Sequence, residues 1–133
     1  MKLAAMFVCA ICASACAQPS ERLLDAIRQV ESGGREDLVG DGGRAIGPYQ
    51  IHRAYWQDAV AADRSLGGKY EDCKREAYAR RVVRAYLTAY GKGKTTEQMA
   101  RMHNGGRGIL RRVGSRAWHR TTSYWVKIQG AIK

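Results

Sequence analysis

Two carboxyl side chains, Glu31 and Asp41, stand at either end of a glycine-rich segment in the first third of the sequence. Glu31 follows Ile27 by four residues, so it extends the apolar stripe of a predicted helix close to that helix's C-terminal end. Loss of hydration and the negative end of the helix dipole both favour the protonated carboxyl, which is the form that a general acid requires. The other interpretation is an ordinary surface glutamate at a frayed helix end.

Asp41 lies between Gly40 and the pair Gly42-Gly43, a composition typical of a tight turn. In such a turn its carboxylate accepts backbone amide hydrogen bonds and stays near water, and both effects favour the charged form. One protonated and one charged carboxyl is the division of labour used in glycoside hydrolysis. The alternative for Asp41 is a residue that only stabilises its turn, since Asp-Gly is a common turn pair.

Aromatic and polar residues that suit a sugar ligand follow in two clusters. The stretch "PYQIHRAYW" offers the flat faces of Tyr49, Tyr55 and Trp56, with the polar side chains of Gln50 and His52 between them. The stretch "MHNGG" places His103 and Asn104 at a predicted helix end, before glycines that allow close backbone approach to a ligand. Core packing of the aromatic residues and helix capping by Asn104 are the structural alternatives.

The elements that must position these residues are mainly helical. Apolar residues recur at three- and four-residue intervals over residues 20–30, with Ser20 as the N-cap and Gly33-Gly34 as the stop. Residues 37–50 predict one small β-hairpin. Further helices are predicted from near His52 to the "LGG" break at residues 66–68, over residues 73–90, after the capping box of Thr95 and Gln98, and in a short final segment with Tyr124, Trp125 and Ile128. The fold class is therefore mainly α, within α+β.

Residues 1–17 differ from the rest of the chain. Lys2 is followed by an apolar run that ends in "ACA", which predicts a signal peptide and leaves residues 18–133 as one domain. The run is short for a transmembrane segment, so we expect export rather than anchoring: a secreted protein, or a periplasmic one in a bacterium. Cleavage would leave Cys73 as the single cysteine, expected as a surface or half-buried thiol.

The chain is strongly basic, with 23 lysines and arginines against 12 acidic residues and a net charge of +11. Loss of Lys2 with the signal would leave a net charge of +10. Such a field favours polyanions, including an anionic bacterial surface. Export, together with the absence of zinc-finger spacing or an RNA-binding aromatic pattern, argues against a nucleic-acid partner.

Several of these motifs occur in the same order in a known family. "VESGG", an aspartate before "GPYQIHRAYW", then "VVRAYL", "ARMHNGG" and "SYW" resemble the invertebrate-type, destabilase-like lysozymes over nearly all of residues 18–133. The segment "LLDAIRQVESGG...AIGPYQI" is also similar to the soluble lytic transglycosylases, which share the lysozyme-like fold. In cysteine content the sequence departs from the animal members of the family, which are rich in cysteine.

The resemblance implies a lysozyme-like catalytic domain that cleaves the β-1,4 bond between N-acetylmuramic acid and N-acetylglucosamine in peptidoglycan. It assigns Glu31 as proton donor and Asp41 as nucleophile or cation stabiliser, and it implies a monomer with no metal or organic cofactor. It implies substrate contacts in the stretch from His52 to Asp58, which includes Tyr55 and Trp56, and at Tyr86, His103, Asn104 and Gly105. The alternatives are a lytic transglycosylase that uses Glu31 alone and a non-enzymatic, cationic wall-binding protein.

Overall fold

The computed structural model describes residues 18–132, so the predicted signal peptide and Lys133 lie outside the described part of the chain. The first helix, α1 (Glu21–Ser32), begins where Leu23 N donates to the Ser20 side chain at 3.1 Å. It ends where Gly33 adopts a left-handed conformation, with φ of 64°, and donates to Gln29 O. Both predicted ends of this helix are present, and they fix Glu31 in its last turn.

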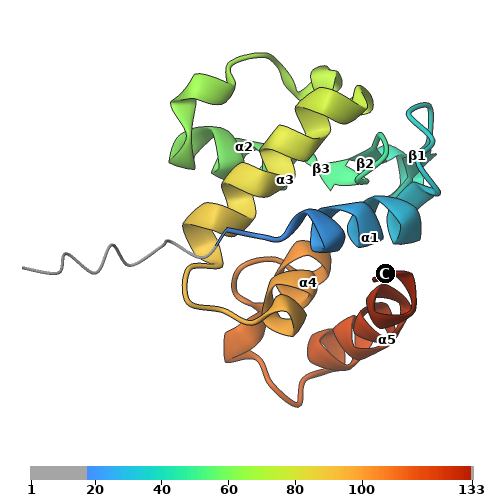
Figure 1. Ribbon diagram of the computed structural model, residues 1–133, viewed down its shortest axis with the longest axis vertical. Helices are drawn as coiled ribbons and strands as arrows, with labels where there is room; N and C mark the ends of the chain where they lie inside the picture. The colour runs from blue at the N-terminus through green and yellow to red at the C-terminus, as the bar shows by residue number, and fades with distance from the viewer. Residues whose placement is uncertain (1–17, 133) are drawn as a thin grey trace, which may run out of the picture.

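A small sheet follows α1 (Figure 1). Strands β1 (Val39–Gly40), β2 (Ala45–Ile46) and β3 (Ile51–His52) pair antiparallel in that order, and the 3₁₀ turn η1 (Asp41–Gly43) joins the first two. Val39 pairs with Ile46, and Ala45 pairs with His52. The predicted hairpin is therefore present, and β3 adds a third strand that was not predicted. Its pairing brings His52 beside the turn that carries Asp41.

Four more helices complete the described part of the chain: α2 (Arg53–Ala62), α3 (Glu76–Tyr90), α4 (Thr96–Gly105) and α5 (Arg116–Ala131). Three short 3₁₀ helices connect them: η2 (Arg64–Leu66), η3 (Tyr70–Lys74) and η4 (Ile109–Arg111). The mainly helical class with a small sheet is confirmed. Three details of the prediction are wrong. Helix α2 ends at Ala62 rather than at the "LGG" break, residues 73–90 split into η3 and α3, and the final helix has 16 residues rather than being short.

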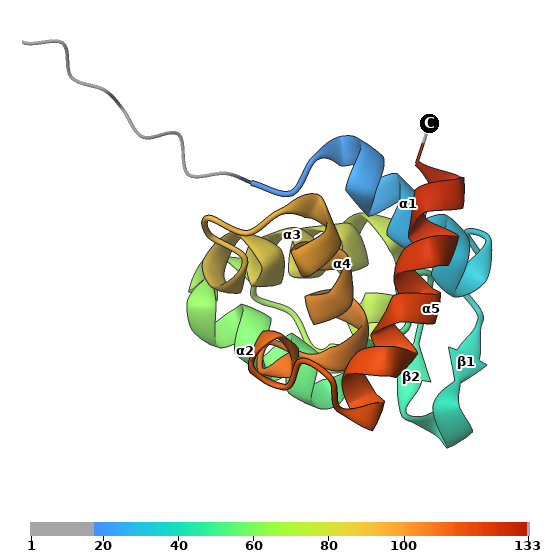
Figure 2. The same cartoon turned by 90° about the horizontal axis from the view of Figure 1, so that it is seen from below.

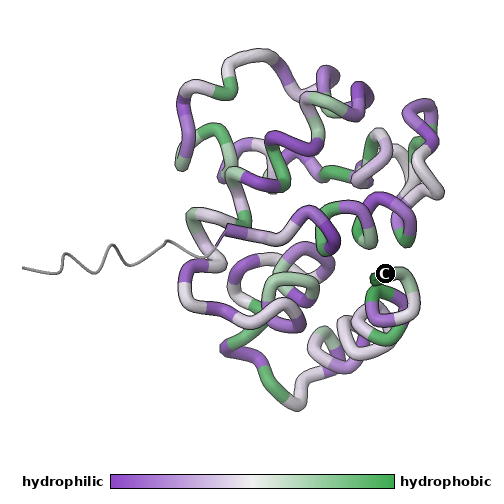
Figure 3. Tube along the Cα trace, in the orientation of Figure 1, coloured by the Kyte–Doolittle hydropathy of each residue, from purple (hydrophilic) through white to green (hydrophobic). Residues whose placement is uncertain are grey.

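Helices α3, α4 and α5 pack against α1, and α2 packs on α3. This helix lies between the half of the molecule formed by α3 and the sheet and the half formed by α4 and α5, and Figure 2 shows α5 running beside it. Hydrophobic and hydrophilic residues alternate along the helical segments (Figure 3), as expected for helices that bury one face. Within residues 18–132 no helix combines the length and the apolar composition that a membrane crossing requires.

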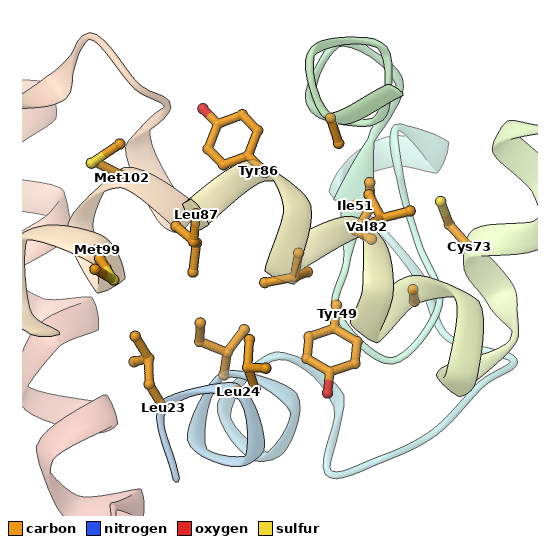
Figure 4. Close-up of a cluster of buried hydrophobic side chains, with 14 of the residues drawn as sticks. Leu23, Leu24, Tyr49, Ile51, Cys73, Val82, Tyr86, Leu87, Met99 and Met102 are labelled. Atoms are coloured by element: carbon orange, nitrogen blue, oxygen red, sulfur yellow. The ribbon is translucent and has the colours of Figure 1, made fainter. Parts of the chain in front are cut away.

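The hydrophobic core contains side chains from all five α-helices and from strands β2 and β3. Leu23 and Leu24 of α1 face Leu87 of α3 and Met99 of α4 (Figure 4). Cys73 is fully buried beside α3, so the expectation of a surface or half-buried thiol is wrong, and burial raises its pKa to about 12. The prediction missed this position because it lies in a turn whose neighbours in the sequence are charged.

Candidate functional site

Two adjoining cavities lie where the sheet meets α2 and α4. The first, called the carboxyl cavity, has a volume of about 340 Å³ and is lined by Glu31, Asp41, Ala45, Gln50, His52, His103 and Asn104. The second, called the aromatic cavity, has a volume of about 360 Å³. Gln50, His52, His103 and Asn104 line both. The two cavities therefore adjoin, and both predicted carboxyl groups line the carboxyl cavity.

Glu31 enters the carboxyl cavity from the last turn of α1, and only 18% of its side chain is exposed. The following residue ties the end of the helix to the sheet: Ser32 Oγ donates to Pro48 O at 2.8 Å and accepts from Gly34 N at 2.9 Å. Pro48 lies between β2 and β3. The buried Ser32–Pro48 hydrogen bond thus holds the end of α1, and with it Glu31, against the sheet connection.

A chain of side chains leads from Glu31 into the core. His103 Nε2 lies 3.4 Å from Glu31 Oε1, and His103 Nδ1 lies 3.0 Å from Tyr55 Oη. Tyr124 Oη is buried and has no hydrogen-bond partner of good geometry within residues 18–132. Burial raises the pKa of Tyr55 and of Tyr124 well above the ordinary value, and the Glu31 carboxyl contributes to both shifts. Both phenols therefore stay protonated and available as donors near Glu31.

Asp41 lies in η1, the turn between β1 and β2, and 47% of its side chain is exposed. Its Oδ1 accepts from Arg44 at 3.0 Å, and its Oδ2 lies 3.1 Å from His52 Nε2. Its φ of 51° is left-handed, a conformation that aspartate and asparagine tolerate better than most residues. The Asp41 carboxylate thus contacts Arg44 and His52 at a half-exposed position, whereas the Glu31 side chain is mostly buried.

The aromatic cavity is walled by stacked rings. Tyr55 of α2 stacks on Tyr86 of α3 with their centroids 3.7 Å apart, and burial raises the pKa of Tyr86 to about 12. At the cavity lining, Arg107 Nε lies 3.5 Å from Asp58 Oδ2, and its guanidinium covers the Tyr90 ring. This end presents flat apolar faces beside a few polar groups, a pattern suited to a sugar ring.

Most of the predicted site residues meet at these cavities. The cavities bring together Glu31, Asp41, His52, Tyr55, Asp58, Tyr86, His103 and Asn104. Trp56 does not line either cavity: its indole N–H donates to Tyr78 Oη at 2.9 Å, and its ring packs against Tyr70. Tyr49 is completely buried in the core. Gly105 does not line either cavity, and a Cβ there would lie 2.9 Å from Ile109 Cγ1 and from Thr121 Cγ2.

Three residues at the site were not predicted as site residues, and they join Gln50, which was. Gln50 holds a left-handed φ of 48° and donates to Leu38 O and to Gly47 O, which shapes the floor of the carboxyl cavity. Arg44, Arg107 and Tyr124 complete the set. Tyr124 falls on the apolar stripe of α5, so its spacing indicated burial only. Within residues 18–132 no group of three or more histidine, cysteine, aspartate or glutamate side chains is placed to hold a metal ion.

Comparison with known proteins gives matches over most of the chain. The family model described as Destabilase matches residues 20–130. The structure of the Tapes japonica lysozyme is 28% identical, with a TM-score of 0.62, over 83% of this chain and 88% of that one. An inhibitor-bound lysozyme from Meretrix lusoria is 30% identical, with a TM-score of 0.64, over 84% and 89%. A structure of Aeromonas hydrophila PliI in complex with Meretrix lusoria lysozyme matches at 30% identity and a TM-score of 0.58, over 79% and 89%.

Proposed function

The chain belongs to the Destabilase family, and from this premise we propose that it hydrolyses peptidoglycan with Glu31 as general acid and Asp41 as partner carboxylate. Family and structural similarity make the chain a glycoside hydrolase of the lysozyme type. The observation that carries the assignment of residues is the carboxyl cavity, which is lined by one nearly buried and one exposed carboxyl group. That asymmetry separates a proton donor from a charged stabiliser.

The reaction follows from these two environments. Glu31 donates its proton to the glycosidic oxygen between N-acetylmuramic acid and N-acetylglucosamine, and the bond from that oxygen to the anomeric carbon breaks. The Asp41 carboxylate attacks the anomeric carbon or stabilises the positive charge that develops there. Glu31, now a carboxylate, takes a proton from water as the water oxygen bonds to the same carbon; where Asp41 has bonded to that carbon, this step breaks the bond and returns Asp41 as a carboxylate. Product release then leaves Glu31 protonated and Asp41 charged.

The aromatic cavity supports binding of a neighbouring sugar. Tyr55 and Tyr86 offer a stacked wall, and Asp58, Asn104 and His52 offer polar atoms for hydroxyl and acetamido groups. Because the two cavities share four lining residues, a polysaccharide lying along both would place one sugar beside Glu31 and Asp41 and a neighbouring sugar against Tyr55 and Tyr86.

Surface charge supports capture of the anionic wall. Arg111, Arg112, Arg116 and Arg120, here called the basic patch, are exposed along η4, the following turn and the first turns of α5. In the described part of the chain, none of these four side chains forms an ion pair or a hydrogen bond. Free cations attract a polyanion over about 10 Å at 0.1 M salt. We propose that the protein acts as an exported monomer on this wall.

Product analysis tests the proposal. Mass spectrometry of digested peptidoglycan should find reducing N-acetylmuramic acid ends, whereas anhydromuramic ends would indicate a lytic transglycosylase. Glu31→Gln should abolish both product release and killing of bacteria. Glu71→Gln, which changes an exposed glutamate in η3, serves as the matched control and should keep activity. Equal killing by Glu31→Gln and the parent would support a non-enzymatic cationic mechanism.

A further inference from the structure

His103 lies at the lining of both cavities next to Glu31, but its own side chain is almost fully enclosed. Only 3% of its side chain is exposed, while its Nε2 is 3.4 Å from Glu31 Oε1. Its ring meets Tyr55 edge-on with centroids 5.2 Å apart and stacks near Tyr124 at 6.4 Å. A side chain so enclosed offers little surface to a sugar, although the family resemblance implies a substrate contact for it.

The Tyr55 hydroxyl selects one form of the His103 ring. Within residues 18–132 the only hydrogen-bond partner of Tyr55 Oη is His103 Nδ1, at 3.0 Å, and burial keeps the phenol protonated. If Tyr55 donates to Nδ1, the ring proton sits on Nε2, the nitrogen that lies 3.4 Å from Glu31 Oε1. If Nδ1 carries the proton instead, the buried Tyr55 hydroxyl has no acceptor, which is costly. The donor chain therefore runs from Tyr55 through His103 to Glu31.

We propose that His103 is a positioning residue for Glu31, held by Tyr55 with its proton on Nε2, and that it stabilises the Glu31 carboxylate between the two halves of the reaction. This inference rests on the proposed function. In the first half Glu31 loses its proton to the leaving oxygen, and the Nε2–H donor then accompanies the new carboxylate. In the second half that same carboxylate takes the proton of the attacking water.

Other titratable groups face Glu31 and must be kept constant in any test. Tyr124 Oη approaches from α5, Asp41 lies across the carboxyl cavity, and His52 accompanies Asp41. The negative charge of Asp41 repels a negative charge on Glu31 in the same cavity, whereas the Tyr124 hydroxyl is a second hydrogen-bond donor near Glu31. Only His103 combines a ring nitrogen near Glu31 with a fixed donor on its other side.

Three variants separate positioning from sugar contact. His103→Phe removes the donor and keeps a ring, His103→Gln restores an N–H donor of similar reach, and Tyr55→Phe keeps the stacking on Tyr86 but removes the hydroxyl. For His103→Phe we expect kcat to fall about tenfold, the value of one charged hydrogen bond, with KM within about twofold of the parent. His103→Gln should recover most of that loss, and Tyr55→Phe should show a smaller loss of the same kind.

A second readout needs no turnover. Carbon-13 NMR of the labelled Glu31 carboxyl in the free protein should show its titration moved to higher pH in His103→Phe and by less in Tyr55→Phe. A raised KM with unchanged kcat, or an unmoved titration in folded Tyr55→Phe and His103→Phe, overturns the inference. If the parent releases no reducing ends, the proposed function fails, while the titration still decides whether His103 acts on Glu31.

Discussion

Asp41→Asn should remove most of the activity and very little of the stability. Asparagine has nearly the same shape and tolerates the left-handed φ of 51°, so the turn should persist. The ion pairs lost with Arg44 and His52 are exposed, and exposed pairs contribute about 0–1 kcal/mol each. A net loss of about 1 kcal/mol corresponds to a fall of roughly 4 °C in Tm for a domain of this size.

The catalytic effect should be much larger, because the carboxylate faces charge that exists only in the transition state. Removal of one preorganised group that stabilises such charge costs about 10²–10³ in kcat, or roughly 3–4 kcal/mol. The assay is release of reducing ends from purified peptidoglycan, with Tm measured by circular dichroism on the same samples. Asp37→Asn, an exposed change in the same loop, serves as the matched control.

The result that would refute this reasoning is a folded Asp41→Asn protein that keeps a tenth or more of the parent's kcat, since the expected loss is at least about 10². Arg44→Gln adds a further check. It removes one ion-pair partner of Asp41 but leaves the carboxylate, so its effect should be much smaller than that of Asp41→Asn. Equal losses in the two variants would point to the shape of the loop rather than to the charge of Asp41.

The remaining predictions concern charge and packing. Replacing the four arginines of the basic patch with glutamine should lower wall lysis at low salt. At 1 M salt the same change should leave lysis nearly unchanged, because charges then act over only about 3 Å. An equal loss of lysis at both salt concentrations would exclude electrostatic capture. Glu21 has a pKa lowered to about 2 by hydrogen bonds from Arg84 and Arg80, so its contribution to stability is complete above its ordinary value of 4.5 and is lost as pH falls toward 2. The Tm difference between the parent and Glu21→Gln should shrink over that range, and a constant difference would contradict the argument. Gly105→Ala should lower the free energy of unfolding, measured in urea, by about 1–3 kcal/mol, because the new Cβ meets Ile109. Gly130→Ala in α5 places its Cβ in open space and serves as the control. Equal stability of the two variants would contradict this prediction.

Local signals in the sequence account for the elements that were predicted well. The Ser20 cap and the glycine stop of α1 act within a few residues, as does the capping box in which Thr95 and Gln98 bond each other's backbone amides. These interactions need no partner from elsewhere in the chain, so they can be predicted from spacing alone. The placement of Glu31 followed from the same helix, because its position four residues after Ile27 sets its direction.

The residues that sequence reasoning misplaced depend on distant partners. Tyr55 and Trp56 are neighbours on α2, and adjacent helical residues point about 100° apart, so one faces the cavity and the other faces Tyr78. Which of them faces the cavity is decided by the packing of α2 on α3. Gly105 illustrates the same limit, since the atoms that exclude a side chain there belong to η4 and α5.

Precise placement of Glu31 in a domain of this size requires that α1 be held firmly, and the described part of the chain holds a single, free cysteine. Polar contacts at both ends of α1 take the place of a covalent link. At its start Arg80 binds Glu21 and Asp25 and also donates to Tyr49, while at its end Ser32 binds Pro48. Each exposed ion pair is weak alone, but the buried Ser32 bond lies next to the acid. Loosening that end, as in Ser32→Ala, would therefore move Glu31 relative to Asp41, and a small displacement of this kind costs catalysis far more than it costs stability.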